Sequence, residues 1–251
     1  MKDILALAAP IDQYSLKMIE DIKRSKLFKI RIIITTKNQK KNIWKLKKIV
    51  KDTNCKIFCH GLPHRNKKIT NLLLKKKIKL GISTGFVNLI KKSFLRMFEE
   101  GIISVHHAYL PDIKGSHSPF WSILNARPYG SSLHYMNEKF DSGKIIDRIK
   151  VKNNLFTTAE EIFHRSRQLS VKLMKKNLKK IYKGKIKTLE NKKNKIYFKK
   201  YIEKEINLNL NETIKIKKLW AIIRGTKFDN HGIFFNIKNK KFKVISTIEE
   251  V

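Results

Sequence analysis

The stretch ILALAAPIDQYSLKMIEDIKRSKLFKIRIIITT, residues 4–36, decides the fold of this chain. It opens with a short apolar run and closes with KIRIIITT (29–36), which is rich in β-branched residues and typical of a strand. Between these runs, Leu16, Ile19 and Ile22 recur at helical spacing. The stretch therefore predicts strand, helix and strand in succession, which is the unit from which parallel sheets are built.

The same alternation continues along the chain. Further strands are predicted at 56–61, 79–84 and 102–107, and the helices between the strands at 40–52, 66–77 and 87–99. We therefore expect an α/β fold in which helices cover a mostly parallel sheet. Ligands of such sheets bind beyond the carboxyl ends of the strands. The fifth predicted strand ends on His106 and His107, which places polar side chains at that edge.

The pattern changes after the fifth strand, where a loop punctuated by Pro and Gly leads into a short helix. Two further strands are predicted at 131–136 and 144–151, with turn residues between them. We expect one α/β domain over residues 1–185, a basic connector at 186–205, and a small C-terminal α+β module at 206–251.

A long helix is predicted after the last of these strands. Its start offers two candidate capping boxes, Thr157 with Glu160 and Thr158 with Glu161. Gly184 is suited to end the helix, because glycine readily adopts the left-handed conformation that closes many helices.

The charge of the chain is extreme. Basic residues number 57 against 20 acidic ones, for a net charge of +37 over 251 residues. Such a field attracts polyanions, including nucleic acid. However, Arg supplies only 9 of the 57, and the lysines are spread along the whole chain. Because bidentate phosphate contact favours Arg, we attribute the charge to A/T-rich genome composition and keep a polyanion partner as the alternative.

Two cysteines and two histidines form the pattern Cys-x3-Cys-His-x3-His, at Cys55, Cys59, His60 and His64. The spacing could suggest a zinc site. The local pattern predicts a short strand, however, and neighbouring strand residues point to opposite faces. We therefore expect no metal there. Two thiols without a wider disulfide framework favour a reducing compartment.

No apolar run approaches the roughly eighteen residues of a membrane-spanning helix. We therefore expect no membrane insertion. The apolar run at 4–9 is interpreted as a buried strand and not as a secretory signal, because Asp3 precedes it and no small-residue cleavage site is followed by a polar start. We expect a cytoplasmic protein.

The segment SVHHAYLPDIKGSHSPFWSILNARPYGSSLHYMNEKFDSGKIID, residues 104–147, carries several polar and glycine residues at defined spacing. It resembles the core of the N10-formyltetrahydrofolate-dependent formyltransferases, whose approximate pattern is Asn-x-His-x-x-x-Leu-Pro-x-x-x-Gly, then Gly-x-x-x-His, then Leu-Asp-x-Gly. The residues that carry the resemblance are His106, Leu110, Pro111, Gly115, Gly130, His134, Phe140, Asp141 and Gly143. The resemblance implies a Rossmann-like formyltransferase domain.

Formyl transfer needs donors aimed at a developing oxyanion and a group that takes a proton from the amine. The resemblance implies that His106 stabilises the transition state and handles the proton, and that Asp141 orients His106 and a water molecule. The chain departs from the family pattern at Ser104, where the family has Asn. A serine hydroxyl still donates, but with a shorter reach, and His107 is the nearest alternative donor.

The resemblance also implies that the co-substrate is N10-formyltetrahydrofolate, bound along GISTGFV (81–87). Glycine permits close approach of the backbone to a ligand, and backbone groups in this stretch could pair with the edges of the pterin. The alternative is an ordinary strand-to-helix turn. The residues expected to bind the folate are Gly81, Ser83, Thr84, Gly85, Phe86, His134 and Gly143.

The sequence defines the acceptor amine less well than the folate co-substrate. The YLP…FW pattern and the tail at 223–235 resemble enzymes that formylate nucleotide-linked amino sugars. The residues expected to contact the acceptor are His107, Tyr109, Lys114, Gly115, Trp121, Trp220 and Arg224, with Phe228 and Phe234 as further candidates. Alternatively, the aromatic residues of the tail only fasten the C-terminal module to the main domain.

Other functions stay open at this point. Methionyl-tRNA is the second candidate acceptor, which the basic charge favours. Hydrolysis of formyltetrahydrofolate is a third candidate, because HHAYLP (106–111) is similar to the HHSFLP of the deformylases. A basic binding protein built on a catalytically weak formyltransferase scaffold is a fourth, and tRNA would then be a binding partner. Glycinamide ribonucleotide is disfavoured by the tail after residue 206. Pairing as a homodimer is also open.

Overall fold

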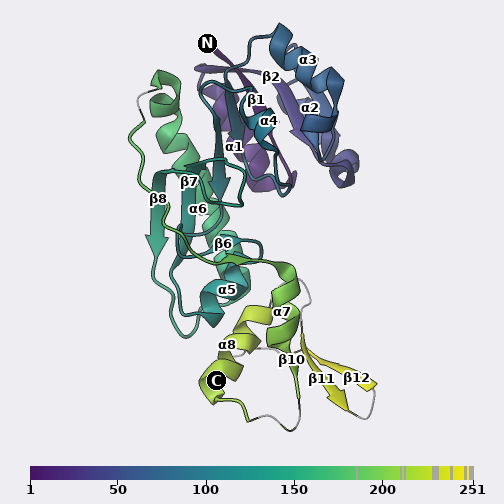
Figure 1. The fold of residues 1–251 in the computed structure, drawn as a ribbon, viewed down its shortest axis with the longest axis vertical. Helices are drawn as coiled ribbons and strands as arrows, with labels where there is room; N and C mark the ends of the chain where they lie inside the picture. The colour runs from purple at the N-terminus through teal and green to yellow at the C-terminus, as the bar shows by residue number, and fades with distance from the viewer. Residues whose placement is uncertain are drawn as a thin grey trace.

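The computed structural model describes residues 1–184, 186–209, 211, 213–227, 232–237, 240–245 and 248. Within them, seven strands form one sheet in the order β3-β2-β1-β4-β5-β7-β8 (Figure 1). The strands are β1 Lys2–Leu7, β2 Phe28–Thr35, β3 Lys56–Cys59, β4 Leu80–Ser83, β5 Ile102–His106, β7 Tyr129–Tyr135 and β8 Ile145–Val151. The first five are parallel, β7 is antiparallel to both of its neighbours, β5 and β8, and β8 therefore runs in the direction of the first five. The predicted α/β fold with a mostly parallel sheet is confirmed.

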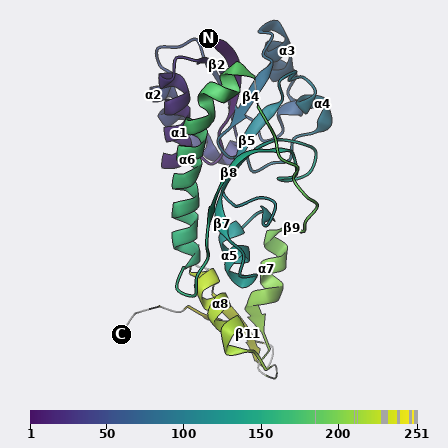
Figure 2. The ribbon, with the colours of Figure 1, turned by 90° about the vertical axis from the view of Figure 1, so that its left-hand side faces the viewer.

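Helices cover both faces of this sheet because side chains alternate along each strand. Ile4 and Ala6 of β1 join the core that includes Met18 and Leu173, whereas Leu5 and Leu7 join the core on the opposite face. The helices are α1 Gln13–Arg24, α2 Ile43–Ile49, α3 Lys67–Lys75, α4 Lys92–Leu95, α5 Ser118–Leu124 and α6 Ala159–Lys183, with 3-10 turns at Lys37–Asn42 and Pro63–Arg65. Figure 2 shows α6 running along the sheet for much of the length of the molecule.

Two predicted helices differ from the structure. The helix expected at 87–99 is reduced to the single turn of α4, and residues 84–91 form an irregular loop. In that loop Ile90 is buried, whereas Val87 is 62% exposed, so the apolar residues share no helical face. The helix expected at 40–52 is divided into a 3-10 turn and the shorter α2.

The ends of α6 agree with the prediction. Of the two candidate capping boxes, the structure forms the one with Thr158 and Glu161, in which each side chain receives a backbone N–H of the other residue. Gly184 ends the helix at a φ of 69°. Among the described residues, no helix combines the length and the apolar character needed to cross a membrane.

The C-terminal region adds a small packed module at one end of the elongated molecule (Figures 1 and 2). Its elements are β9 Ile196–Tyr197, α7 Lys199–Ile206, β10 Asn207–Leu208, α8 Ile216–Thr226, β11 Ile233–Ile237 and β12 Lys240–Val244. Strands β10, β11 and β12 form one sheet, and β9 pairs with β6, Lys114–Gly115, of the main domain. Ile202 and Ile222 share a hydrophobic cluster with Trp121. The exact domain boundaries stay a prediction.

Candidate active site

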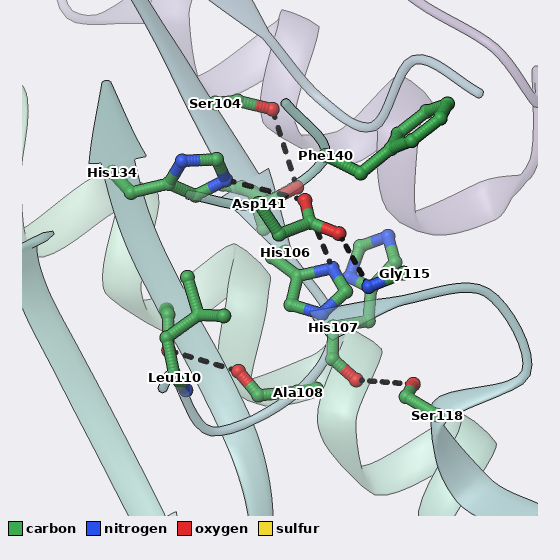
Figure 3. A network of polar contacts seen from close by, with 12 residues as sticks. Ser104, His106, His107, Ala108, Leu110, Gly115, Ser118, His134, Phe140 and Asp141 are labelled. Carbon is green, nitrogen blue, oxygen red and sulfur yellow. Dashed lines mark hydrogen bonds and ion pairs between the residues drawn. The ribbon is translucent and has the colours of Figure 1, made fainter. Parts of the chain in front are cut away.

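The residues of the spaced pattern converge at the carboxyl end of β5 (Figure 3). Antiparallel pairing of β5 with β7 sets Ser104 opposite His134. The turn after β7 then returns Asp141 toward both histidines. One carboxylate oxygen of Asp141 lies 3.5 Å from Nδ1 of His106 and 3.6 Å from Nε2 of His134. The two rings are almost perpendicular, at 89°.

Asp141 is held on its other side by the glycine of the pattern. Its second carboxylate oxygen accepts a hydrogen bond of 2.8 Å from the backbone N–H of Gly115. Asp141 itself has a φ of 49°, in the left-handed region that residues other than glycine adopt rarely. Such backbone conformations persist where the surroundings hold them, and they cluster at functional sites.

His106 has an oxygen acceptor at each ring nitrogen. Nδ1 faces Asp141, and Nε2 lies 3.1 Å from the backbone carbonyl of Ile113. A ring that carries protons on both nitrogens satisfies both oxygens. The geometry is therefore suited to a histidine that passes through its protonated form.

The other two histidines are buried and held neutral. Burial lowers the pKa of His134, although Asp141 opposes the shift. Nδ1 of His134 lies 2.8 Å from the carbonyl of Tyr135. Burial, with Arg167 and His106 nearby, lowers the pKa of His107 well below its usual value. Nδ1 of His107 lies 2.7 Å from the hydroxyl of Ser170 on α6.

Two cavities lie on either side of this cluster. The larger one has a volume of ≈ 440 Å³ and is lined by His106, His107, Gly115 and residues of α6. The smaller one is a narrow slot of ≈ 30 Å³. Apolar side chains of Phe86, Leu89, Ile90, Met136 and Phe140 line the slot, together with the polar residues Asn88, Ser104, His134, Asn137 and Asp141. His106 lines the larger cavity and Asp141 lines the slot, so their contact lies between the two.

The folate-binding residues expected from the sequence are distributed unevenly. Phe86 and His134 line the slot. Gly81 was expected in a ligand-binding loop, but it lies inside β4, where its N–H donates to Gly101 and its Cα packs against Ile102. Ser83 and Thr84 are also buried, and the Thr84 N–H donates to Leu7.

Gly85 and Gly143 lie where the conformation or the packing of the backbone favours glycine. Gly85 has a φ of 110°, and a Cβ there would lie 3.3 Å from Nε2 of His107. A Cβ at Gly143 would lie 1.9 Å from the carbonyl oxygen of Tyr135, so only glycine fits this turn.

The acceptor residues expected from the sequence divide into two groups. His107 and Gly115 line the larger cavity. Lys114 is buried, and its ammonium group donates to the carbonyl of Lys192. Burial lowers the pKa of Lys114, and the neighbouring Asp141 opposes that shift.

Like Lys114, four further expected acceptor residues do not line the larger cavity. Tyr109 lies under the guanidinium of Arg148, and Trp121 is stacked on Tyr197 in the core. Nε1 of Trp220 donates to the carbonyl of Leu155. The buried Arg224 donates to the carbonyls of Asn154 and Thr157. The last two contacts fasten α8 to the main domain, which is the alternative that the sequence left open.

Phe234 packs beside the C-terminal hydrophobic cluster, and Phe228 lies outside the described residues. The sequence did not reveal four further residues that line the larger cavity, namely Asn38, Gln39, Phe163 and Arg167. The guanidinium of Arg167 lies 3.5 Å from the ring centre of Phe163 and 3.3 Å from a carboxylate oxygen of Asp12. A usable signal was the rarity of arginine in this lysine-rich chain.

The cysteine and histidine pattern near β3 forms no metal centre among residues that the structure describes. Burial raises the pKa of Cys55 to about 12, so its thiol stays protonated. A protonated thiol is a poor metal ligand.

Comparison with known proteins agrees with this geometry. The chain belongs to the formyl transferase family, whose model matches residues 11–178, more than half of the chain. A GDP-perosamine N-formyltransferase from Brucella melitensis is 34% identical over 85 residues, which cover 34% of this chain and 33% of that protein. A methionyl-tRNA formyltransferase from Buchnera aphidicola is 30% identical over 150 residues, which cover 59% of this chain and 48% of that protein. The chain spans a third to about half of the length of these relatives.

Solved structures share the fold along the whole chain. A 4-N formyltransferase from Francisella tularensis superimposes with a TM-score of 0.82 at 19% identity, covering 100% of this chain and 99% of that one. An N-formyltransferase from Helicobacter canadensis, solved with folinic acid and dTDP-3-aminofucose, superimposes with a TM-score of 0.68 at 19% identity. That superposition covers 98% of this chain and 86% of the other.

Proposed function

We propose that this protein transfers a formyl group from N10-formyltetrahydrofolate to the primary amine of a nucleotide-linked amino sugar. The observation that carries the proposal is the placement of His106 and Asp141 between two cavities of different character. Transfer between two ligands needs both reacting atoms at one point, and in this contact a residue that lines one cavity meets a residue that lines the other.

The slot suits the pterin of the folate. Phe86 and Phe140 offer apolar surface to a flat ring, whereas Asn88 and Asn137 offer polar groups to its edge. The slot has a volume of ≈ 30 Å³, which is too small for a bicyclic ring, so the side chains that line it must separate when the folate enters. The prediction of a helix over residues 87–99 is wrong at residues 88–90, which line the slot as an irregular loop.

The chemistry follows from the positions of the polar groups. The amine nitrogen attacks the formyl carbon, a C–N bond forms, and the bond from that carbon to N10 of the folate breaks. Protonated His106 exchanges the Ile113 carbonyl at Nε2 for the formyl oxygen as negative charge develops on that oxygen, which lowers the barrier. The proton lost by the amine passes to Asp141, directly or through one water molecule, and Asp141 returns it to N10 as the bond to N10 breaks.

Ser104 takes the position that Asn holds in the family pattern. Its hydroxyl lines the slot, and its one described hydrogen bond, to the carbonyl of Val105, is long at 3.5 Å. We assign it the role of a second donor to the formyl oxygen. A donor with this weak competing bond turns toward a stronger acceptor at small energetic cost.

The larger cavity suits a small acceptor. Its aromatic wall, from Phe120 and Phe163, and its polar groups, from Asn38, Gln39 and Arg167, match the mixed surface of a sugar. The fold shared with the Helicobacter canadensis enzyme, which was solved with dTDP-3-aminofucose, supports a sugar acceptor. Methionyl-tRNA is the second candidate, because the Buchnera aphidicola relative and the +37 charge favour it.

A cytoplasmic location and a homodimer belong to the same proposal. The free thiols of Cys55 and Cys59 support a reducing compartment. Phe156 and Ile216 are 80% and 83% exposed; Phe156 follows Leu155, whose carbonyl accepts from Trp220, and Ile216 lies about one helical turn before Trp220 on α8. Exposed apolar side chains grouped in this way mark association surfaces. Light scattering at several concentrations measures the mass of the particle, and a strictly monomeric mass contradicts the dimer.

The function is tested by titrating the protein with 5-formyltetrahydrofolate and then offering it acceptors with N10-formyltetrahydrofolate. Folate binding that weakens at least about tenfold in Phe140→Ser, but not in Phe163→Ala, supports the slot. Formylated product is then sought by mass spectrometry among dTDP-, UDP- and GDP-linked amino sugars and methionyl-tRNA. Product from methionyl-tRNA alone selects the second candidate. Absence of folate binding, with salt-sensitive RNA binding, selects the basic binding protein.

A further inference from the structure

Part of the segment predicted as a basic connector passes behind the two loops that carry Asp141 and Gly115 of the candidate active site. We call residues 189–197 the strap. In Figure 1 its green trace leaves the end of α6, passes β8 and reaches β6 and α7. It begins with a pair of backbone hydrogen bonds between Leu189 and Ile145, of 2.9 and 2.7 Å.

The strap first holds the turn that carries Asp141. The side-chain amide of Asn191 donates to the carbonyl of Asp141 and to the carbonyl of Gly143, each at 2.9 Å. One amide group thus spans the tight turn in which Asp141 has its left-handed backbone. A backbone held in such a conformation needs contacts that prevent its relaxation.

The strap then holds the loop that carries Gly115. The ammonium group of Lys114 donates to the carbonyl of Lys192 at 2.9 Å, and Asn194 donates to the carbonyl of Pro111 at 3.0 Å. Strand β9 of the strap pairs with β6, and Tyr197 accepts a hydrogen bond from the N–H of Ser116.

The two loops are therefore fixed to each other twice. On the side of the reacting groups, the carboxylate of Asp141 accepts the Gly115 N–H. On the other side, the strap joins both loops through their backbones. The stack of Tyr197 on Trp121, with ring centres 4.6 Å apart, anchors the strap in the cluster that includes α7 and α8.

We propose that the strap is a positioning element of the reaction, and that Asn191 is its key positioning residue. By holding the backbone of the turn, it keeps the Asp141 carboxylate at nearly equal distances from His106 and His134, 3.5 and 3.6 Å. This inference rests on the proposed function. Small misplacements of reacting groups reduce turnover strongly, so a relaxed 141–143 turn separates the carboxylate from the two rings. The C-terminal module then supports catalysis through the strap, in addition to lining the larger cavity with Ile202 and Gly225.

The test compares Asn191→Ala and the isosteric Asn191→Asp, which replaces the two N–H donors by acceptors, with the control Asn125→Ala. Asn125 also donates from its amide to a backbone carbonyl, that of Trp121, but lies outside the site. We expect kcat to fall by about thirtyfold in both Asn191 variants, with KM for folate and acceptor changed by less than about threefold. In Asn125→Ala, kcat stays within about twofold of the unchanged protein.

A second measurement does not depend on turnover. The pKa of His134 is set by burial and by four neighbours, which are Asp141, His106, Lys114 and the Tyr135 carbonyl. Because Asp141 raises that pKa, moving the carboxylate away lowers it further. Histidine NMR, assigned with His134→Gln, is expected to show a lower titration midpoint for His134 in Asn191→Ala than in the unchanged protein.

An unchanged His134 midpoint in Asn191→Ala overturns the inference, whether or not the protein transfers formyl groups. The inference is also overturned if kcat falls equally in Asn191→Ala and in the control Asn125→Ala when the two variants have the same melting temperature. If the unchanged protein formylates no acceptor, the proposed function fails, and the NMR midpoint alone decides on the strap.

Discussion

Replacing Asp141 by Asn removes the charge of the site and keeps its shape. The amide of the new side chain can still accept the Gly115 N–H through its oxygen, so the turn is expected to stay in place. At 3.5 Å from the nearest nitrogen of His106, the lost carboxylate accounts for about 5 kcal/mol with protonated His106 at an effective dielectric constant of about 20. Both side chains retain some exposure, so we reduce the figure to about 3 kcal/mol.

A loss of about 3 kcal/mol in the transition state lowers kcat by about a hundredfold. The assay follows formylated acceptor by mass spectrometry, with the melting temperature measured on the same samples. Asp52→Asn is the matched control, because Asp52 is exposed and its one ion pair within the described part of the chain is with Lys23, at 3.7 Å. A kcat for Asp141→Asn within about threefold of the unchanged protein refutes the role that we give to this carboxylate.

Three further outcomes are expected. Because the pKa of His107 lies below its unfolded value, stability is fully present above about pH 6.5 and is lost as pH falls toward the folded pKa; His107→Gln should flatten the loss between pH 7.5 and 5 in thermal melts. Gly143→Ala should destabilise the protein by about 3 kcal/mol in urea, because its Cβ meets the Tyr135 carbonyl, whereas Gly184→Ala, with open space around it, should lose only about 1 kcal/mol. Thr158→Ala should lose about 1 kcal/mol by breaking the capping box of α6, and equal stability in the two proteins would contradict that cap.

The sheet was predictable because its buried strands are runs of β-branched and aliphatic residues bounded by turns. The centre of the site was predictable for a different reason. His106, His134 and Asp141 sit at fixed spacing around two strand ends, and antiparallel pairing brings that spacing together. The apolar residues at 87–90 led to the wrong prediction of a helix. The spacing of apolar residues in a sequence does not distinguish a helix face from a loop that lines a cavity.

The rest of the site was not predictable, because it comes from distant segments through ordinary residues. Arg167 and Phe163 look like parts of the surface of a long helix, and only tertiary packing turns them toward the larger cavity. Asn191 lies in a polar, lysine-rich stretch that carries no pattern. Conversely, Trp220 and Arg224 are conspicuous residues in the sequence, yet their partners are carbonyl groups of the loop before α6.

The measurement that tests the central claim most directly is a single-turnover transfer, with enzyme in excess over N10-formyltetrahydrofolate and an amino-sugar nucleotide in the same tube. We predict that the formylated sugar appears as free tetrahydrofolate is released, and that His106→Ala slows this step by at least about a hundredfold while folate binding persists. Folate that binds and is released without formylation of any amine, or equal rates in the two proteins, contradicts the account.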